Sequence, residues 1–333
     1  MQAKAIYRQL AMLCLLVVFF SCSFYVFQGV LQEWTQSNVL CDELSARIKV
    51  GHSTLGVKVV NRTIHQCINR PAMARARYAV VSLITKDKYP LVESAVKLAR
   101  SVRWWLDEDQ MDLVMLLMEP ASSTSSLSLQ RGGWTICEVP VIECGPACST
   151  DDSHFVIAKL YTKLHVWAMA EYEAVLYLDT DTLVIRDPSN VFMYYLPSMM
   201  QHGYDLAAAR DRPFFMPGFN AGVMLVRPTL HKFSVLVESI VTVTHTCGYA
   251  EQSLLNAVYG TKYSELPFVY NANLVSVQRE PGLWNDNWNR IVILHFTVSK
   301  GWNNLHRLWI MHRSSFDCWW WGTTEICDLW ENA

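Results

Sequence analysis

The sequence predicts an α/β fold, a mostly parallel sheet flanked by helices and preceded by one transmembrane helix. Short apolar runs of strand length alternate with amphipathic stretches from about residue 77 onward. An Asp-x-Asp triplet directly follows the fourth of these runs, and an apolar segment near the N-terminus is long enough to cross a bilayer. We expect a single domain over residues 76–333.

Four apolar runs have the length of buried strands. Alternation of such runs with helical segments is typical of a parallel sheet covered by helices on both sides. One helix is expected from Pro90 onward and another over residues 157–170, because apolar residues recur there every three or four positions. The serine-rich run 122–126 is interpreted as a mobile surface loop. The expected strands are residues 78–84, 113–118, 134–139 and 175–178.

The overall composition narrows the class of protein. Hydrophobic residues make up 51% and charged residues 17% of the 333 residues, which excludes an extensively disordered chain. The formal net charge is −2, so the chain has no basic excess of the kind that marks a nucleic-acid binder. We therefore expect no nucleic acid among its partners.

The N-terminal segment has the features of a signal anchor. Lys4 and Arg8 precede a nearly unbroken apolar run over residues 10–31, and about 20 such residues span a bilayer as a helix. Basic residues on that side favour a cytosolic tail, residues 1–9, and a lumenal body. A polar, weakly periodic stem is expected over residues 32–75. The sequence thus predicts a single-pass type II protein of the Golgi or ER membrane.

A cleaved signal peptide is the alternative to this anchor. Its small-residue cleavage site would lie at residues 21–23. The apolar run resumes at residues 24–27, and this continuation favours an uncleaved anchor.

Cysteine usage fits an oxidising lumen. Two cysteines lie inside the expected anchor and eight beyond it, an even number that indicates disulfides without revealing their pairing. Sequence-local pairing, of the first two and of the last two of the eight, is one interpretation. A zinc site of Cys137, Cys144 and Cys148 is the alternative, although no fourth ligand lies nearby at the usual spacing. The eight are Cys41, Cys67, Cys137, Cys144, Cys148, Cys247, Cys318 and Cys327.

An acidic pair stands at the end of the fourth expected strand. Asp179 and Asp181 are two residues apart, so on an extended backbone their carboxylates point the same way. Ligands of such sheets bind beyond the carboxyl ends of the strands. Oxygen ligands suit Mg²⁺ or Mn²⁺, and a cation of this kind can bridge the two phosphates of a nucleotide-sugar. A solvated turn is the simpler explanation of an isolated Asp-x-Asp.

Two further segments place polar groups at the start of expected elements. Asn220 and Gly222 precede an apolar strand, where a glycine allows close approach of another group. Glu251 and Gln252 begin an amphipathic helix. Their simpler explanations are a turn for the first segment and helix capping for the second.

A last segment combines a histidine and a lysine after an apolar run. The neutral imidazole of His295 can complete a metal site, and the ammonium of Lys300 can bind phosphate. A lone histidine at a strand end is usually structural and a lone lysine usually solvated. Together with Asp179 and Asp181 they favour a functional site.

These segments, in this order and spacing, are similar to the glycogenin-like glycosyltransferases of family 8. The resemblance covers most of residues 78–302. It is carried by residues 161–167 (YTKLHVW), 178–184 (LDTDTLV), 220–223 (NAGV), 252–256 (QSLLN), 266–271 (LPFVYN) and 295–302 (HFTVSKGW).

The resemblance implies a GT-A nucleotide-diphospho-sugar transferase fold, a UDP-sugar donor and transfer with retention at the anomeric carbon. It also implies a Mn²⁺ cofactor, with Mg²⁺ as the alternative. The sugar is expected to be a hexose, and the acceptor a glycan, a glycolipid or a protein. It leaves room for a homodimer.

The resemblance also assigns roles to individual residues. The metal would be held by Asp179, Asp181 and His295. The nucleotide-sugar would be held by Leu83, Thr85, Tyr89, Thr180, Asn220, Ala221 and Lys300, with the diphosphate at Lys300. Gln252, Glu251 and Lys163 are the expected catalytic group, with Lys163 and Asn220 facing the sugar. An amide is a poor nucleophile, so Gln252 does not predict a covalent intermediate.

The sequence departs from the family pattern in several places. Glu251 replaces the usual aspartate and is one methylene longer, which puts the recognition of sugar hydroxyls in doubt. Lys86 stands where the uridine loop usually has asparagine, and Val298 and Gly301 replace a glycine and a proline. The basic residue that usually precedes the YTKLHVW string and an acceptor tyrosine have no clear counterpart. The chain therefore resembles membrane-anchored relatives that modify glycans or glycolipids more than it resembles glycogenin.

Two other classes of function remain open at this point. A metal-dependent phosphodiesterase would need further acidic or histidine ligands. A catalytically inactive glycan-binding member could use the tryptophans that gather near the C-terminus, although burial or packing near the membrane also explains them. The tryptophans are Trp302, Trp309, Trp319, Trp320, Trp321 and Trp330.

Membrane topology gives a first test. Asn61-Arg62-Thr63 is the single glycosylation sequon, and a lumenal body exposes it to glycosylation. We expect glycosidase treatment to lower the mass of the expressed chain, and Asn61→Gln to remove that shift. Digestion of residues 77–333 by a protease added outside sealed microsomes would contradict the expected orientation.

Overall fold

The computed structural model describes residues 66–68, 76–107, 109–144, 159–212 and 218–297, all within one compact unit, residues 57–333. None of the helices in these ranges is long and apolar enough to cross a membrane. The expected anchor, residues 10–31, lies outside them, as do Lys300 and the C-terminal tryptophans.

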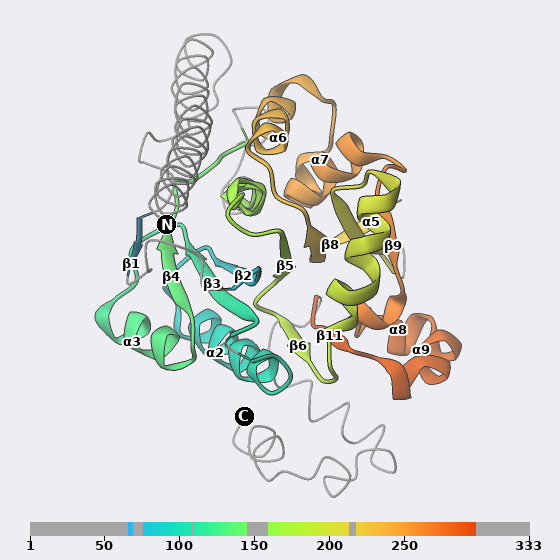
Figure 1. Cartoon of the computed structure of the whole chain (residues 1–333), viewed down its shortest axis with the longest axis horizontal. Coiled ribbons are helices and arrows are strands. Elements are labelled where there is room, and N and C mark those ends of the chain that lie inside the picture. Colours follow the sequence, from blue (N-terminus) through green and yellow to red (C-terminus); the bar gives the residue numbers. More distant parts are fainter. Residues whose placement is uncertain (1–65, 69–75, 108, 145–158, 213–217, 298–333) are drawn as a thin grey trace, which may run out of the picture. The chain divides into compact units, whose positions relative to one another are not determined.

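The main sheet has eight strands in the order β1-β4-β3-β2-β5-β8-β7-β9 among the described residues (Figure 1). Strands β4, β3, β2 and β5 run parallel, β8 is antiparallel to β5 and to β7, and β9 is parallel to β7. The mostly parallel sheet is therefore confirmed. The strands are β1 (Gln66–Ile68), β2 (Tyr78–Ile84), β3 (Met111–Leu117), β4 (Thr135–Glu138), β5 (Ala174–Leu178), β7 (Leu206–Arg210), β8 (Phe219–Val226) and β9 (Ser264–Leu266).

Strand β1 lies inside the region expected to be a stem. It pairs antiparallel with β4, with Cys67 opposite Cys137. Main-chain pairing to an edge strand requires no apolar run, which explains why the hydrophobic pattern did not indicate this strand.

Helices cover both faces of the parallel strands. Helix α2 (Tyr89–Arg103) buries Val92, Ala95, Ala99 and Val102, and these side chains share a core cluster with Leu176 and other residues of one sheet face. The next residue along β5, Tyr177, points the opposite way, beneath Lys163 of η2 (Lys159–Ala168). Helices α6 (Leu230–Thr242) and α7 (Ala250–Tyr259) pack against η2.

The helix predicted over residues 157–170 needs adjustment. Residues 157–170 were expected to form an amphipathic helix, but η2 is a 3₁₀ helix, and each residue from Tyr161 to Ala168 is buried. This burial arises because η2 is enclosed between the sheet and the helices α6 and α7. The Trp167 indole donates to the hydroxyl of Tyr259 at 2.9 Å, which fastens η2 to α7.

The serine run was wrongly predicted to be a loop. Residues Ser123–Arg131 form helix α3. Ser122 caps it, because its hydroxyl accepts from the backbone N–H of Ser125 at 3.2 Å, while its own N–H donates to Asp87 at 2.7 Å. Leu129 is fully buried and anchors the helix, so capping and one apolar contact outweigh the low helix propensity of serine.

A second, three-stranded sheet has the order β10-β11-β6, from β10 (Ala272–Asn273), β11 (Ile293–His295) and β6 (Thr182–Val184). Its outer side packs against Trp284 and Trp288. The remaining elements are η3 (Val191–Tyr195), a π-helical turn, α5 (Leu196–His202), η4 (Cys247–Tyr249), η5 (Phe268–Tyr270), α8 (Ser276–Arg279), α9 (Pro281–Asn287) and η6 (Trp288–Arg290).

The described cysteines overturn the zinc alternative. Cys137, Cys144 and Cys247 are each disulfide-bonded, and a sulfur in a disulfide is not a thiolate ligand. Two of the three proposed zinc ligands are thereby removed, and the expectation of disulfides is confirmed for these residues. The sequence-local pairs fall on Cys41, Cys318 and Cys327, which lie outside the described residues, and on Cys67, whose side chain is not described.

One glycine of β8 allows the two sheets to approach each other. A Cβ on Gly222 would lie 2.2 Å from Cε1 of His295 and 2.8 Å from its Nε2. Such distances are far below van der Waals contact, so the imidazole of β11 occupies the space that a side chain at position 222 would need. The sequence indicated that another group approaches Gly222 closely, but it did not indicate that this group is the imidazole of His295.

Substitution of this glycine should be costly. We expect Gly222→Ala to lower the free energy of unfolding by about 1–3 kcal/mol, because the buried imidazole of His295 must move. Gly282→Ala is the control, since no atom lies within 4 Å of the added Cβ there. Urea denaturation of both variants checks this, and equal stabilities would show that the imidazole moves without cost.

Candidate active site

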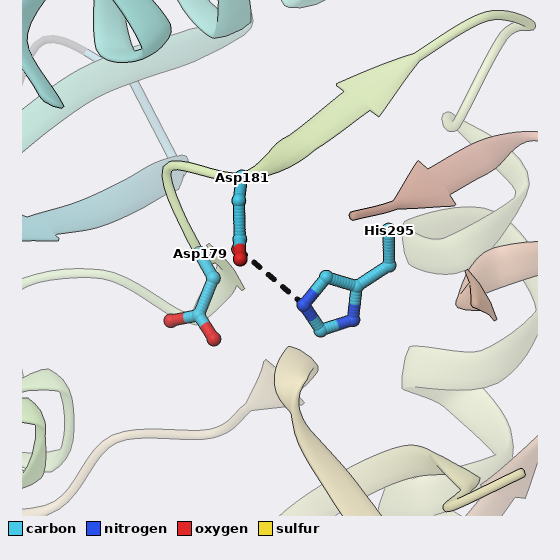
Figure 2. A group of neighbouring side chains, drawn as sticks. All are labelled: Asp179, Asp181 and His295. Atoms are coloured by element: carbon cyan, nitrogen blue, oxygen red, sulfur yellow. Dashed lines mark ion pairs between the residues drawn. The ribbon is translucent and has the colours of Figure 1, made fainter. Parts of the chain in front are cut away.

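Three predicted ligands come together at the edge of the main sheet. The ligand atoms of Asp179, Asp181 and His295 all lie within 4.8 Å of one another. Asp179 and Asp181 lie on the turn between β5 and β6, and Figure 2 shows the carboxylate of Asp181 directed at the imidazole of His295, which comes from the end of β11. The structure therefore brings together the three side chains that the sequence predicted as metal ligands.

Strand pairing creates this convergence. β11 runs antiparallel to β6 with His295 opposite Thr182, so the histidine lies beside the aspartate that precedes Thr182. The N–H of Phe296 donates to the carbonyl of Asp181 at 2.9 Å, and the N–H of Asp179 donates to the carbonyl of Gly222 at 2.8 Å. The turn is thus held by backbone hydrogen bonds from both sheets.

The charges of the aspartates act on the histidine. Nε2 of His295 lies 3.4 Å from Oδ1 of Asp181. Burial alone would lower the pKa of His295, but the charge and hydrogen bond of Asp181 and the charge of Asp179 outweigh it, so the pKa lies above its ordinary value. A cation at this site would compete with a proton for the imidazole.

This donor set fits a divalent metal ion. Two carboxylates and an imidazole supply oxygen and nitrogen ligands for an ion such as Mn²⁺. The side chain of His295 is 3% exposed, and those of Asp179 and Asp181 are 30% and 27% exposed, so the site is open on the carboxylate side. A substrate that brings its own oxygen ligands can therefore reach the ion.

A buried lysine lies beside the metal-binding group. Nζ of Lys163 is 3.0 Å from Oδ1 of Asp179 and 2.5 Å from Oε1 of Glu251, and it donates to the carbonyl of Ala221 at 3.2 Å. Burial would lower the pKa of Lys163, but Asp179 and Glu251 raise it above its ordinary value, so the lysine is charged. Tyr177 adds a hydroxyl donor to Oδ1 of Asp179 at 2.7 Å.

The structure thus brings together Lys163 and Glu251, two of the expected catalytic residues. Both are buried, at 4% exposure each. Their mutual ion pair and the contact with Asp179 place them behind the metal ligand. Glu251, noted as a departure from the family pattern, thus has its carboxylate on the lysine.

The third expected catalytic residue belongs to a separate amide network. Gln252 accepts from the N–H of Ala221 at 3.0 Å and donates to Oδ2 of Asp211 at 3.0 Å. Asn220 donates to Oδ1 of the same aspartate at 3.0 Å. Asp211 is 3% exposed, and burial raises its pKa against the opposing effect of the two amides.

Sequence reasoning missed Asp211. It directly follows β7, whose residues Leu206–Ala209 are apolar and buried. A carboxylate at the end of a buried strand is the same signal that indicated Asp179, and it was available in the run LAAAR.

The residues expected to hold the nucleotide lie at the same edge. Leu83 is buried in β2, Thr85 is half-buried directly after it, and Tyr89 is 77% exposed at the start of α2. β2 and β5 are parallel neighbours, so their carboxyl ends share the edge that carries Asp179. Thr180 is half-buried within the Asp-x-Asp turn. Lys300 lies outside the described residues, so its expected contact with a diphosphate stays a prediction.

Part of the chain matches a known protein family. The family described as Glycosyl transferase family 8 matches residues 147–306, which include the metal-binding group, Asp211 and the helix that carries Gln252. This range begins after β4 and contains the second half of the main sheet together with the small sheet.

Curated relatives of the chain come from animals and plants. Glycogenin-2 of Homo sapiens is 28% identical over 237 residues, covering 68% of this chain and 43% of that protein. Glycogenin-1 of Oryctolagus cuniculus is 24% identical over 237 residues, covering 68% and 65%. UDP-glucuronate:xylan alpha-glucuronosyltransferase 1 of Arabidopsis thaliana is 24% identical over 191 residues, covering 57% and 26%. The chain thus spans less than two thirds of the length of each of these relatives.

A solved structure shares the fold. The apo form of the glycosyltransferase GlyE of Streptococcus pneumoniae superposes with a TM-score of 0.51 at 21% identity, over 67% of this chain and 55% of that chain. This likeness shows the fold, and the family match together with the curated relatives makes residues 147–306 similar to glycosyltransferase family 8.

Proposed function

We propose that the chain is a metal-dependent, retaining glycosyltransferase that moves a hexose-type sugar from a UDP-sugar to a glycan, glycolipid or protein acceptor. The convergence of Asp179, Asp181 and His295 within 4.8 Å carries the proposal, because such a group suits the ion that accompanies a diphosphate leaving group. A relative whose name specifies UDP-glucuronate supports a UDP-sugar as donor.

Mn²⁺, or Mg²⁺ in its place, would be held by the three metal ligands and would neutralise the negative charge of the departing diphosphate. The chain's own groups have distinct tasks around it. Lys163 and Tyr177 hold Asp179 in place through its Oδ1. Leu83, Thr85 and Tyr89 would hold the uridine, and Lys300 the diphosphate.

The amide network supplies the groups that would meet the sugar. Asp211, Asn220 and Gln252 hold one another in fixed orientations through three hydrogen bonds of 3.0 Å, two on Asp211 and one on the N–H of Ala221. Sugar hydroxyls are recognised by such fixed donors and acceptors. Glu251 is occupied by Lys163, so we assign it to positioning and keep Gln252 as the catalytic candidate. A covalent intermediate on either residue is not part of the proposal.

We also propose that the enzyme is a type II protein of the Golgi or ER membrane with its catalytic domain in the lumen. The apolar run 10–31 with Lys4 and Arg8 before it supports this. The disulfides of Cys137, Cys144 and Cys247 support it as well, because such bonds persist in oxidising compartments.

The two rival functions are less well supported. A phosphodiesterase would want more ligands than the three that converge in the described part of the chain. An inactive glycan-binding protein has no need for a complete metal group with Lys163 and Tyr177 arranged behind it.

Removal of one metal ligand tests the proposal. The full-length chain is incubated with Mn²⁺ and each of a panel of UDP-sugars, and release of UDP is measured. We expect at least one sugar to be turned over, and Asp181→Asn to lower that turnover by at least about 100-fold, because a bound cation supplies several kcal/mol. Asp286→Asn, an exposed aspartate of α9, is the control. Equal turnover in Asp181→Asn and the parent would exclude the metal assignment.

The lysine of the last motif can be tested by donor binding. A charged hydrogen bond to a diphosphate contributes about 1.5–3 kcal/mol, so Lys300→Ala should weaken UDP-sugar affinity by roughly one to two orders of magnitude. Mn²⁺ affinity should change less. Lys262→Ala, an exposed lysine, serves as control, and calorimetry measures all three proteins. Unchanged donor affinity would leave Lys300 a solvated residue.

A further inference from the structure

The sequence string LPFVYN ends in an asparagine for which the proposed function gives no task. Asn271 stands directly before β10 and is 4% exposed. Its side-chain Oδ1 lies 2.8 Å from Nδ1 of His295, and its Nδ2 lies 3.0 Å from Oδ1 of Asn220. It therefore links a metal ligand to the amide network that surrounds Asp211.

The orientation of this network follows from two backbone donors, which cannot accept. The N–H of Gly222 donates to the side chain of Asn220 at 2.9 Å, so Asn220 must present its oxygen there. The amide nitrogen of Asn220 then faces Asp211, a carboxylate that accepts. The N–H of Ala221 orients Gln252 in the same manner, with its amide nitrogen on the other oxygen of Asp211.

The orientation of Asn271 follows in turn. Because the oxygen of Asn220 can only accept, Asn271 must offer its NH₂ group to it, and its own oxygen must face His295. An amide oxygen cannot donate, so Nδ1 of His295 has to carry a proton. In the neutral imidazole the lone pair then lies on Nε2, the nitrogen that faces Asp181 in Figure 2.

We propose that Asn271 is a positioning residue that holds His295 in its Nδ1–H form and thereby directs the Nε2 lone pair into the metal site. The proposal rests on the proposed metal site. As whole residues, His295 is 2% exposed and Asn271 4%, so solvent is a poor replacement for the amide oxygen at Nδ1. Partners of this kind on the second ring nitrogen orient metal-ligating histidines in general.

The chain offers a matched control. Asn273 lies two residues after Asn271, is also 4% exposed, and sits opposite His295 in the pairing of β10 with β11. Its oxygen accepts from the N–H of Val275 at 3.0 Å and from the hydroxyl of Thr297 at 2.8 Å. Replacement of Asn273 removes a buried amide next to the site without removing the partner of Nδ1.

The first experiment reads the tautomer directly. The imidazole nitrogens of the full-length chain are observed by ¹⁵N NMR without metal, above the pKa of His295, and His295→Gln identifies the signal. We expect the Nδ1–H form in the parent, in Asn273→Ala and in Asn271→Asp, whose carboxylate also accepts from Nδ1. Asn271→Ala should show a mixture with the Nε2–H form. An Nε2–H parent, or an Asn271→Ala variant that stays Nδ1–H, would overturn the proposal.

The second experiment measures Mn²⁺ affinity by electron paramagnetic resonance, without donor or acceptor. Loss of a partner of this kind weakens metal binding about 10- to 100-fold, and we expect this for Asn271→Ala. Asn271→Asp should recover most of the affinity and Asn273→Ala should retain it. Equal affinities in Asn271→Ala and Asn273→Ala would overturn the proposal.

Two outcomes separate the proposals from each other and from a folding defect. If the parent itself binds no Mn²⁺, the proposed function fails, and the tautomer measurement alone decides the role of Asn271. If Asn271→Ala does not fold, the Asn271→Asp variant decides. An Nδ1–H imidazole in this variant together with near-parental Mn²⁺ affinity supports the role of Asn271. An Nδ1–H imidazole with Mn²⁺ affinity lowered tenfold or more overturns it.

Discussion

The active-site region depends on three consecutive peptide groups at the start of β8, from Asn220 to Gly222. The carbonyl of Gly222 accepts from the N–H of Asp179, and the carbonyl of Ala221 accepts from Lys163. The N–H groups of Ala221 and Gly222 orient Gln252 and Asn220. Strand β8 is antiparallel to β5 and to β7, so these peptides face both the Asp-x-Asp turn and the aspartate after β7. Main-chain atoms therefore position the groups that would perform the chemistry.

Charge balance explains the arrangement behind the metal ligands. Asp179 and Glu251 both approach the one ammonium of Lys163, within a region where neither Glu251 nor Lys163 reaches solvent. An unpaired buried charge would be costly, and two carboxylates around one lysine leave a net negative charge that a divalent cation can balance. The ring of Tyr177 lies 4.8 Å from the ammonium and adds a cation–π contact. The site is thus built to hold positive charge at its open side.

The small sheet brings His295 to the aspartates. Trp284 and Trp288 pack against its outer surface and hold β10 and β11 next to β6. His295 belongs to this sheet and Asn271 directly precedes it, while the aspartates and Asn220 belong to the main sheet or its loops. Gly222 lets the two meet, because any side chain there would occupy the volume of the imidazole.

Sequence alone determined the parts of this protein that depend on local pattern. Buried strands such as β2 and β5 are recognisable by their apolar runs. A binding role for the carboxylates after β5 is predicted by the rule that ligands bind at the carboxyl ends of parallel strands. The order of the motifs predicted the metal-binding group, and the structure brings its three members together. A strand end, an Asp-x-Asp spacing and a histidine at the end of an apolar run can all be recognised in the sequence without knowledge of the fold.

Tertiary structure decided what depends on contacts between distant segments. The pairing of β6 with β11 and of Lys163 with Glu251 joins residues that no periodicity relates. Asp211 follows β7, a short strand that is placed in the sheet by its pairing with β8. Helix α3 forms from a serine-rich run of low helix propensity because Ser122 caps it and Asp87 accepts from the N–H of Ser122. The proton position on His295 follows from a chain of hydrogen bonds that begins at a backbone N–H. Side-chain identity sets which bonds are available, but the fold alone determines which donor meets which acceptor.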